Sequence, residues 1–514
     1  MPTITSSPGR AGLVLTAAAV VSCCALARAE AAPPPPPTGP DPIEGKWYGM
    51  AGFPQDRIEL GFEIKRNDQG ELKVYLYEPV LNFYGLELPG ALERKGDDYV
   101  LGSYVTSFRL VDGRIEGTYM PLHDPMSLRR TDSLPGEVPV PDLPRGPGPK
   151  WQVKLGGQIW AAAAVRDSVA YVGTTGGVFN AVSVKDGSFV WTFNAGRPMH
   201  GEPLATDDAV FFVCDNGFLY KLDRATGKEI WRYDLGDART PRILPHQIVY
   251  DYDFKSPRPL LADGAIYVGS GDGSFHAVDA GTGQRLWRFE AGDRIRTDAI
   301  VSGAQVVFGS FDHFVYAVDR KTGQQVWKAD TYAEVDGSPA LIDGKIVLGN
   351  HGSLVEALDP ATGKPVWRRI WWGSAVESTP VGYGGRIYIG ASDLRRITCM
   401  EPKDGRVVWR TDVYGWAWAR PLVTGKIVYI GTGGSEPYQM RHLPAIAALD
   451  RTTGRILWRW PMPVLPGVLY YGFAAPPVLA GSTVVIGGMD GTLYGFAADG
   501  RIPATGLPFR TPAP

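Results

Sequence analysis

Cysteine is scarce in this sequence, with 4 residues in a chain of 514. None of the four belongs to a C-x-x-C or C-x-x-C-H motif, so covalently attached haem is not indicated. Cys23 and Cys24 are adjacent and lie near the N-terminus, whereas Cys214 and Cys399 lie far apart in apolar stretches. We therefore expect Cys214 and Cys399 to be buried free thiols rather than a disulfide.

Charge of one sign is not in excess either, because 52 lysines and arginines face 54 aspartates and glutamates. This balance gives no indication of a nucleic-acid partner or of an anionic surface as ligand. Long apolar runs are confined to residues 1–29, so no later segment is expected to span a membrane. A Ser-His-Asp set, a metal-binding spacing and a phosphate-binding loop are also missing from the sequence.

Residues 1–29 have the pattern of an export signal. Arg10 precedes an apolar, alanine-rich run from Ala11 to Ala27, and Ala27-Arg28-Ala29 fits a small-x-small cleavage site. A second interpretation uses the stretch that ends at Cys23, which resembles a bacterial lipobox with Cys23 as the lipidated residue. A third is an uncleaved anchor, for which the run is short. We predict an exported protein, with lipidation of Cys23 as an open alternative.

Two proline-rich stretches, residues 30–42 and 133–150, are predicted to be extended linkers. Between them, residues 43–132 alternate apolar and polar side chains in short runs, without helical periodicity. We expect a small antiparallel barrel or curved sheet. Its opening G-x-W-x-G around Trp47 and its closing EGTYMP…SLRRT resemble the lipocalin-like β-domain found beside some bacterial secreted hydrolases. Trp47 is expected to be a core residue that closes the barrel, or alternatively to line a ligand pocket.

The rest of the chain is organised by a repeated motif. Ala277 to Trp287 reads AVDAGTGQRLW, and six related copies end at other tryptophans. A short apolar strand ends at an acidic or polar residue, whose side chain can bind the backbone of a tight turn. A glycine that can take a positive φ follows, and the chain returns as a strand that delivers a tryptophan. Hairpin signals at Asp263-Gly264 and Asp272-Gly273 precede this copy, so four strands are expected per repeat.

The motif tryptophans, with Trp151 added, recur at intervals of 40, 40, 56, 40, 40, 42 and 49 residues. A period near 40 with four short strands is typical of propeller blades. Seven copies predict seven blades, and an eighth hairpin, Val484 to Gly500, has no tryptophan strand of its own. We predict that Trp151 completes that blade and closes an eight-bladed ring formed by residues 151–514. The tryptophans expected to fill the gaps between blades are Trp151, Trp191, Trp231, Trp287, Trp327, Trp367, Trp409 and Trp458.

The motif A-x-D-x-x-T-G-x-x-x-W is similar to the tryptophan-docking motif of propellers of the pyrroloquinoline-quinone (PQQ) type. The resemblance covers residues 151–500. It implies an all-β fold, with an eight-bladed propeller after the small β-domain. The family includes quinoprotein dehydrogenases, the BamB lipoprotein of the outer-membrane barrel-assembly machinery, and many sensor and scaffold proteins. The fold therefore does not name one function.

Candidate site residues follow from where the chain enters the innermost strand of each blade, because propellers carry function on the rim of the central channel and in long loops. Aligning the stretches after each motif tryptophan places six residues at one position and four at a second position two residues later. The first set is Trp160, His200, Arg296, Asp336, Glu377 and Trp418, and the second set is Glu202, Arg258, Asp298 and Arg420.

Two interpretations of this predicted channel mouth are open. The alternating charges could form a solvated ring that neutralises itself. They could instead form a polar funnel that binds a ligand or partner, in which Trp160, Trp416 and Trp418 would stack a flat ligand. Asp336 and Glu377, on adjacent blades, could bind Ca²⁺, which prefers carboxylate oxygens. Two carboxylates beside an arginine are also an ordinary ion-pair network.

Two stretches are similar to segments of quinoprotein alcohol dehydrogenases. The extra loop of the longest repeat contains Pro245-His246 and the run Tyr250 to Asp253, similar to a P-H-D-x-W-D-Y-D stretch. The run from Gly431 to Pro437 is similar to a GTGNP run that supplies an asparagine ligand to calcium, but Gly434 stands at the asparagine position. Those enzymes also share a vicinal cysteine pair near the quinone, whereas the only vicinal pair here is Cys23-Cys24.

Three functions are compatible with these patterns. The favoured hypothesis is a non-enzymatic, extracytoplasmic propeller that is BamB-like and binds protein partners in the cell envelope, without a cofactor and without catalytic residues. It would lie in the periplasm or at the periplasmic face of the outer membrane. The first alternative is an alcohol or sugar dehydrogenase that depends on PQQ and Ca²⁺, with Asp336 and Glu377 in its site. The second is a sensory module in which the small β-domain takes up a ligand.

Overall fold

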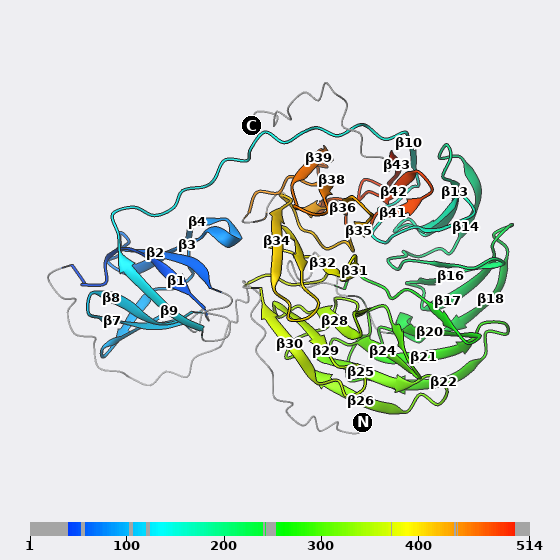
Figure 1. The fold of residues 1–514 in the computed structure, drawn as a ribbon, viewed down its shortest axis with the longest axis horizontal. Coiled ribbons are helices and arrows are strands. Elements are labelled where there is room, and N and C mark those ends of the chain that lie inside the picture. Colours follow the sequence, from blue (N-terminus) through cyan, green and yellow to red (C-terminus); the bar gives the residue numbers. More distant parts are fainter. Residues whose placement is uncertain are drawn as a thin grey trace, which may run out of the picture. The chain divides into compact units, whose positions relative to one another are not determined.

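The computed structural model describes residues 40–52, 57–101, 106–119, 124–239, 242, 253–371, 373–435, 438 and 440–498. These residues are almost entirely β-structure and form two compact units (Figure 1). The first unit contains the described residues of 1–77 and 85–134, and the second contains 78–84 and the described residues from 135 onward. The predicted export segment, with Cys23, lies outside the described residues. Among those described, no helix has the length and apolar character needed to cross a membrane.

The first unit is built on one antiparallel sheet of nine strands. The strands are β1 (Gly45–Ala51), β2 (Ile58–Arg66), β3 (Leu72–Glu78), β4 (Phe83–Glu87), β5 (Leu92–Lys95), β6 (Asp98–Leu101), β7 (Thr106–Val111), β8 (Arg114–Tyr119) and β9 (Asp124–Arg130). Their order is β4-β3-β2-β1-β9-β8-β7-β6-β5, so the first and last strands pair in the middle of the sheet. The predicted antiparallel β-domain is confirmed, while its likeness to lipocalins stays a prediction.

The core of this unit follows from the alternation of side chains along each strand. In β2, Leu60, Phe62 and Ile64 are buried. Trp47 on β1 is fully enclosed, and its indole Nε1 donates a hydrogen bond to the Ile43 carbonyl at 2.7 Å. Trp47 is therefore a core residue, which is the first of the two roles expected from the sequence.

The second unit is a propeller, with eight four-stranded antiparallel sheets in the described part of the chain. Its blades follow one another around a ring in chain order (Figure 1). The innermost strands are β11 (Ala164–Arg166), β15 (Leu204–Ala205), β19 (Leu260–Ala262), β23 (Ile300–Ser302), β27 (Ala340–Ile342), β31 (Val381–Tyr383), β35 (Leu422–Val423) and β41 (Val478–Ala480).

Two middle strands form the centre of each blade. They are β12 (Val169–Gly173) and β13 (Val178–Ser183), β16 (Ala209–Cys214) and β17 (Phe218–Asp223), β20 (Ala265–Gly269) and β21 (Ser274–Asp279), β24 (Gln305–Gly309) and β25 (Phe314–Asp319), β28 (Lys345–Gly349) and β29 (Leu354–Leu358), β32 (Arg386–Gly390) and β33 (Arg396–Met400), β36 (Ile427–Gly431) and β38 (Ala445–Asp450), and β42 (Thr483–Gly487) and β43 (Thr492–Ala497). These strands are the most apolar part of each repeat, and they are buried on both faces.

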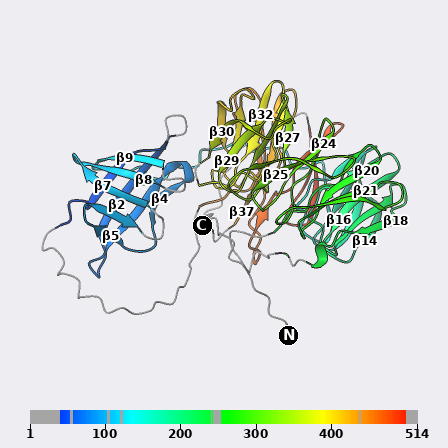
Figure 2. The same ribbon diagram turned by 90° about the horizontal axis from the view of Figure 1, so that it is seen from below.

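The outermost strands carry the motif tryptophans and lie on the outside of the ring (Figure 1). They are β14 (Phe189–Asn194), β18 (Glu229–Asp234), β22 (Arg285–Glu290), β26 (Gln325–Asp330), β30 (Pro365–Ile370), β34 (Val407–Asp412), β39 (Ile456–Pro461) and β10 (Trp151–Lys154). The view from below shows β14 and β18 at the edge of the ring (Figure 2). Short additions are the strand pair β37 (Gly433–Gly434) and β40 (Tyr471–Gly472) and the 3₁₀ turns η1 (Pro79–Leu81) and η3 (Asp237–Arg239).

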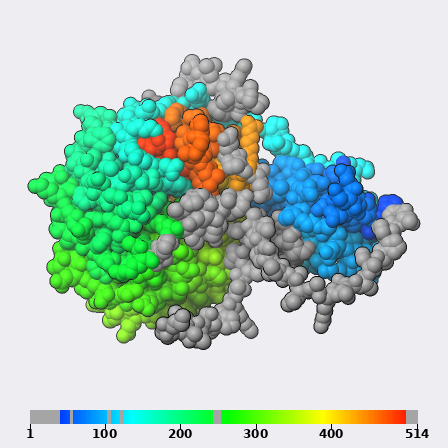
Figure 3. All heavy atoms as spheres, turned by 180° about the vertical axis from the view of Figure 1, so that it is seen from behind, coloured from blue at the N-terminus to red at the C-terminus, as the bar shows by residue number. Residues whose placement is uncertain are grey.

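The ring closes through the first strand of the propeller. β10 pairs antiparallel with β43, with Trp151 opposite Gly495 and Gln152 opposite Tyr494. The eighth blade is therefore made from both ends of the propeller sequence, and in Figure 3 orange and red segments lie beside cyan ones. The predicted all-β, eight-bladed architecture and the predicted role of Trp151 are both confirmed.

The turn of the repeated motif is held by one aspartate. In the third blade, Asp279 Oδ1 accepts hydrogen bonds from the N–H groups of Gly281 and Thr282, at 3.1 and 2.7 Å, and from the Thr282 hydroxyl at 2.8 Å. Gly283 has a φ of +74°, and a Cβ at this position would lie 2.8 Å from the Trp231 ring of the preceding blade. The motif needs glycine here because of the backbone angle and because of the close approach of the ring.

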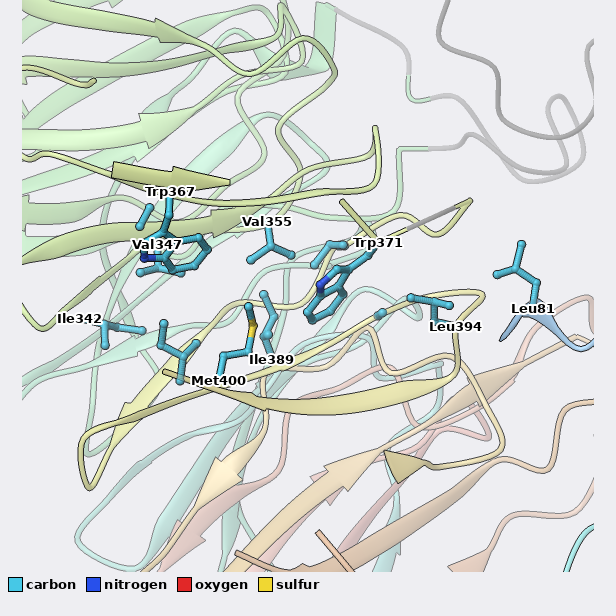
Figure 4. Packing of buried hydrophobic residues seen from close by; sticks show 13 residues of the cluster. Leu81, Ile342, Val347, Val355, Trp367, Trp371, Ile389, Leu394 and Met400 are labelled. Atoms are coloured by element: carbon cyan, nitrogen blue, oxygen red, sulfur yellow. The ribbon is translucent and has the colours of Figure 1, made fainter. Parts of the chain in front are cut away.

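Tryptophan docking joins each blade to the next. The indole Nε1 of Trp287 donates to the Arg320 carbonyl at 2.9 Å, and Trp151, Trp191, Trp327, Trp367 and Trp409 make the equivalent bond. Apolar side chains fill the rest of each gap. Figure 4 shows the gap between the fifth and sixth blades, where Val347 and Trp367 of one blade pack near Ile389 and Met400 of the other.

Candidate functional site

The position four residues before each innermost strand is the structural equivalent of the aligned set from the sequence. Its eight occupants are Trp160, His200, Ser256, Arg296, Asp336, Glu377, Trp418 and Ala474. Ser256 and Ala474 were missing from the alignment, because their blades have an irregular stretch before the innermost strand. Seven of the eight are less than 10% exposed. The charged members therefore form a buried layer, and the interpretation as a solvated ring does not describe it.

Arg296 is the centre of a buried ion network in the third and fourth blades. Its guanidinium binds both carboxylate oxygens of Asp253, at 2.7 and 2.5 Å, and Oδ2 of Asp237 at 2.9 Å. Burial alone would lower the pKa of Arg296, but the charges of Asp253 and Asp237 raise it. Arg296 is therefore a permanent cation, held in the bidentate geometry that guanidinium groups form with carboxylates.

His200 belongs to an extension of the same network. Its Nδ1 lies 3.0 Å from Asp215 Oδ2, and the Arg242 guanidinium lies 2.8 Å from the other oxygen of Asp215. Burial would raise the pKa of Asp215, but the His200 hydrogen bond and the Arg242 charge lower it to about 2. The three guanidinium groups of this network face three carboxylates, so its buried charges balance. They are Arg242, Arg294 and Arg296, against Asp215, Asp237 and Asp253.

The second aligned set forms ion pairs across the channel. Glu202 of the second blade accepts hydrogen bonds from Arg258 at 3.1 Å and from Arg420 at 2.9 Å. Arg420 belongs to the seventh blade, which is not adjacent to the second. Asp298 accepts a hydrogen bond from the Arg258 N–H at 2.8 Å, and burial raises its pKa. These charges neutralise one another and fasten distant blades together.

The predicted aromatic residues pack against each other. Trp416 and Trp418 are stacked, with ring centroids 4.6 Å apart and planes inclined by 13°. Phe254 lies between Trp418 and Trp160, with centroid distances of 5.5 and 5.3 Å. All three tryptophans are buried, and Trp416 Nε1 donates to Asp393 Oδ1 at 2.9 Å. Because these rings are packed against one another, the geometry does not favour stacking of a flat ligand between them.

A carboxylate cluster occupies the boundary between the fifth and sixth blades. Asp336, His351 and Glu377 each offer one ligand-type atom, and the three atoms lie within 4.8 Å of one another. His351 Nδ1 lies 3.4 Å from Asp336 Oδ2. The sequence alignment missed His351 because this residue lies in the β28–β29 loop. A search for histidines one hairpin away from each aligned carboxylate would have found it.

The two carboxylates of this cluster titrate differently. Burial would raise the pKa of Asp336, but the charge of Lys255 and the bond with His351 lower it. Burial, followed by repulsion from Asp336, raises the pKa of Glu377 to about 7. Lys255 Nζ donates to the main-chain carbonyls of Asp336 and Glu377, at 3.1 and 2.9 Å. Lys255 therefore links the main chains of the fifth and sixth blades.

The stretches similar to quinoprotein alcohol dehydrogenases can be compared with this geometry. Pro245-His246 and Tyr250 to Tyr252 lie outside the described residues. At Gly434, a Cβ would lie 2.5 Å from Cβ of His442 and 2.8 Å from Cγ of Pro444. An asparagine side chain therefore does not fit there, and the residues present do not fit the calcium ligand set of the PQQ enzymes.

The cysteines of the propeller are also unlike those of the PQQ enzymes. Cys214 and Cys399 are buried free thiols in different blades, as predicted. Burial raises the pKa of each to about 11. Each thiol is therefore protonated at neutral pH and packs as a small apolar side chain.

One outermost strand is covered by the chain itself. Residues 144–146, in the predicted linker, lie parallel to β39 of the seventh blade, with Arg145 opposite Arg459. Gly146 N–H donates to the Arg459 carbonyl, and Arg459 N–H donates to the Pro144 carbonyl, both at 2.8 Å. Gly146 lies against the Trp458 ring so closely that a Cβ would overlap it. This linker segment thus forms an isolated parallel bridge to β39 and covers Trp458, which is 0% exposed.

Six other outermost strands expose an apolar residue at one repeated position, directly before the motif tryptophan. Its exposure is 40–55% in these blades. The residues are Val190, Ile230, Leu286, Val326, Val366 and Val408. In the covered seventh blade the equivalent residue, Leu457, is only partly exposed. The outer edge of the ring therefore carries one aliphatic side chain per open blade, on a strand that can accept a further strand.

A polar cavity of about 430 Å³ lies beside the outer part of the third blade. Its lining includes Arg239, Asp272, His276 and Arg285. Burial lowers the pKa of His276 to about 4, so this imidazole is neutral near pH 7. The Tyr233 hydroxyl lies 3.1 Å from His276 Nδ1.

These observations define an eight-bladed propeller with tryptophan-docking repeats, in which buried and ion-paired side chains line the channel mouth and six outer strands expose an apolar residue. The model of the family described as outer membrane protein assembly factor BamB matches residues 148–251, 215–369 and 351–502. These matches together span more than half of the chain. The chain belongs to this family.

Individual relatives are distant. BamB of Yersinia pestis is 27% identical over 147 residues, which are 28% of this chain and 36% of that protein. The 1-butanol dehydrogenase (quinone) of Thauera butanivorans is 32% identical over 183 residues, which are 32% of this chain and 27% of that enzyme. The matched region thus spans well under two thirds of either relative.

A solved structure agrees in fold. The crystal structure of BamB from Moraxella catarrhalis superposes with a TM-score of 0.51 at 16% identity, covering 67% of this chain and 95% of that one. At this identity the likeness extends to the fold alone.

Proposed function

We propose that this protein is a non-enzymatic scaffold of the cell envelope, which binds an extended segment of a partner protein along the outer strand of a blade. The observation that carries the proposal is the pairing of residues 144–146 with β39. It is an example, within this molecule, of an extended peptide that uses main-chain hydrogen bonds to add to an outer strand. Such strand addition is a common mode of peptide recognition, in which alternate side chains supply specificity.

The open blades offer the same elements to a partner. In β22, Leu286 is exposed beside the docked Trp287, and Arg285, Arg288 and Glu290 are exposed on the same strand. An incoming strand would cover Leu286, and its main chain would pair with the edge of β22, to which no strand of the described residues is bonded. The charged residues Arg285, Arg288 and Glu290 keep this edge soluble before the partner binds.

The proposed location rests on the N-terminal sequence and on the family. Residues 1–29 carry the export pattern, and Cys23 would become the membrane anchor if it is lipidated. The proline-rich residues 30–42 would then act as a spacer between the anchor and the folded units. We place the protein in the periplasm or on the periplasmic face of the outer membrane.

Edge-blocking variants test the proposal. The double variant Leu286→Lys and Val326→Lys places charges on two open edges, and Leu479→Lys is the matched control, because Leu479 is 44% exposed on an innermost strand. After mild crosslinking in cells that produce the protein, wild type and control should co-purify with the same partner, and the double variant should lose most of it. Partner recovery that is equal for all three proteins would contradict the proposal.

The dehydrogenase alternative is favoured by one observation, the carboxylate pair Asp336 and Glu377 in a chain with quinone-dependent relatives. The filled space at Gly434 and the self-packed tryptophans argue against it. We expect no dye-linked oxidation of alcohols or sugars when the purified protein is mixed with PQQ and Ca²⁺. Turnover that requires both additives and disappears in Asp336→Asn would promote this alternative.

A further inference from the structure

The carboxylate cluster between the fifth and sixth blades has a charge imbalance that the rest of the channel mouth does not have. Asp336 and Glu377 are less than 10% exposed, and each has one carboxylate oxygen without a hydrogen-bond partner among the described residues. No guanidinium group of the described residues lies within 4.0 Å of either carboxylate. Buried carboxylates in this condition need a cation or a proton.

The charges around the cluster can be counted. Asp393 is a third buried acidic group, which acts electrostatically on both Glu377 and His351. Lys255 is the cation that acts on Asp336 and Glu377, and its hydrogen bonds go to their main-chain carbonyls rather than to their carboxylates. When all three carboxyl groups are ionised, they and the one ammonium group leave two negative charges, which is the charge that one divalent cation neutralises.

We propose that Asp336, His351 and Glu377 bind a divalent transition-metal ion, with Zn²⁺ as the best fit. Zinc takes imidazole nitrogen and carboxylate oxygen at about 2.0–2.2 Å, usually in a tetrahedral arrangement. The three ligand-type atoms, within 4.8 Å of one another, reach the spacing of about 3.3 Å that such bonds require through small side-chain rotations. The imidazole selects a transition metal over Ca²⁺, which prefers an all-oxygen shell.

The ligands come from two blades, and this determines what the ion does. Asp336 lies between β26 and β27, His351 lies between β28 and β29, and Glu377 precedes β31 of the next blade. A bound ion would join the fifth and sixth blades where Lys255 already bridges their main chains. Metal binding therefore adds stability to the ring, since a ligand that binds only the folded state shifts the unfolding equilibrium. This site does not depend on the proposed strand addition at the outer edge.

Zinc titration of the chelator-treated full-length protein tests the site. We expect one saturable Zn²⁺ equivalent by calorimetry, an increase in melting temperature with Zn²⁺, and no competition from an excess of Ca²⁺. Cobalt(II) should give visible absorption bands characteristic of a protein-bound ion. Absence of saturable Zn²⁺ binding by the wild-type protein would overturn the proposal.

Three variants assign the ligands. His351→Gln and Glu377→Gln should each weaken Zn²⁺ binding by at least about tenfold, since even residues that only orient metal ligands cost that much when changed. His200→Gln is the matched control, because it removes a histidine from the His200–Asp215 pair of another blade. Melting curves without metal show whether each variant is folded. Wild-type affinity in folded His351→Gln, or equal loss in His200→Gln, would refute the assignment.

Discussion

The seventh blade and the third blade have the same four-stranded sheet, but their outer edges differ. In the seventh blade, residues 144–146 pair with β39 and enclose Trp458 completely. In the third blade, the edge of β22 has no added strand among the described residues, and Leu286 is 55% exposed. The outer strand of a blade thus occurs in two forms in this propeller, paired with a further segment in β39 and without one among the described residues in β22.

The largest expected loss of stability comes from replacing the motif tryptophans Trp458 and Trp287. Trp458→Ala should lower the free energy of unfolding by ~3–5 kcal/mol, as for other large aromatic truncations in a core. Trp287→Ala should cost less, because the Trp287 ring is only partly buried and loses fewer contacts. Urea unfolding of both variants measures the difference. An equal or larger loss for Trp287→Ala would mean that the added strand contributes little to burial.

Protonation of a buried histidine at low pH should favour the unfolded state in both the third and the seventh blade. His276 in the third blade and His442 in the seventh both have a pKa lowered to about 4 by burial, from an ordinary value of 6.5. At these two histidines the folded state then binds fewer protons than the unfolded state between pH 6.5 and 4, so their contribution to stability falls as the pH is lowered through this window. Each histidine can lower the free energy of unfolding by up to about 3 kcal/mol when the pH reaches the lower end of this window.

Unfolding at pH 7 and at pH 5 checks this dependence. On going from pH 7 to pH 5, His276→Gln should gain stability relative to wild type, because the variant has lost one of the two histidines whose protonation favours the unfolded state. A pH difference that is unchanged in His276→Gln would show that His276 is not neutral in the folded state.

Much of the fold could be predicted from the sequence, because the residues that form the turn and the docking contact recur at fixed spacings. Asp279, Gly283 and the tryptophan of the preceding blade act within or between adjacent repeats, so their spacing is visible as a period. The pairing of β10 with β43 could be predicted because the last hairpin has no tryptophan strand of its own, and because the strand of Trp151 has no hairpin before it. The strand formed by residues 144–146 was not predicted, since a proline-rich run indicates an extended chain but not the surface that it covers.

The candidate site was predicted only in part. The alignment found Asp336, Glu377, Glu202 and Arg420, because each occupies a fixed position before an innermost strand. It could not show that Glu202 pairs with Arg420, since this contact joins blades that are far apart in sequence. His351 was missed because its position in the hairpin loop is occupied by unrelated residues in other blades, such as Gly271 and Phe311.

An intermediate effect is expected from Gly146. Gly146→Ala places a methyl group into the Trp458 ring and should release residues 144–146 from β39. We expect a loss of ~1–3 kcal/mol, the usual cost of overpacking a tight site. Gly148→Ala is the matched control, since nothing lies within 4 Å of a Cβ there. Amide exchange of Arg459 should accelerate in the first variant only; protection that persists in Gly146→Ala would contradict the pairing.

The smallest effect on stability is expected at the open edge. Leu286→Thr changes a half-exposed side chain on an outer strand, so the free energy of unfolding should change by no more than about 0.5 kcal/mol. Thermal unfolding of the purified protein measures this change. A loss of several kcal/mol would show that Leu286 belongs to the core of the blade rather than to a binding edge.

Site-specific photo-crosslinking shows directly whether a partner binds at the outer edge of a blade. A photoreactive side chain would replace Leu286, Leu457 or Leu479 in turn, in cells that produce the full-length protein. We expect partner adducts at Leu286, on the edge of β22, and none at Leu457, which lies on the covered edge, or at Leu479, on an innermost strand. Adducts that form equally at all three positions, or only at Leu479, would contradict recognition at the outer edge.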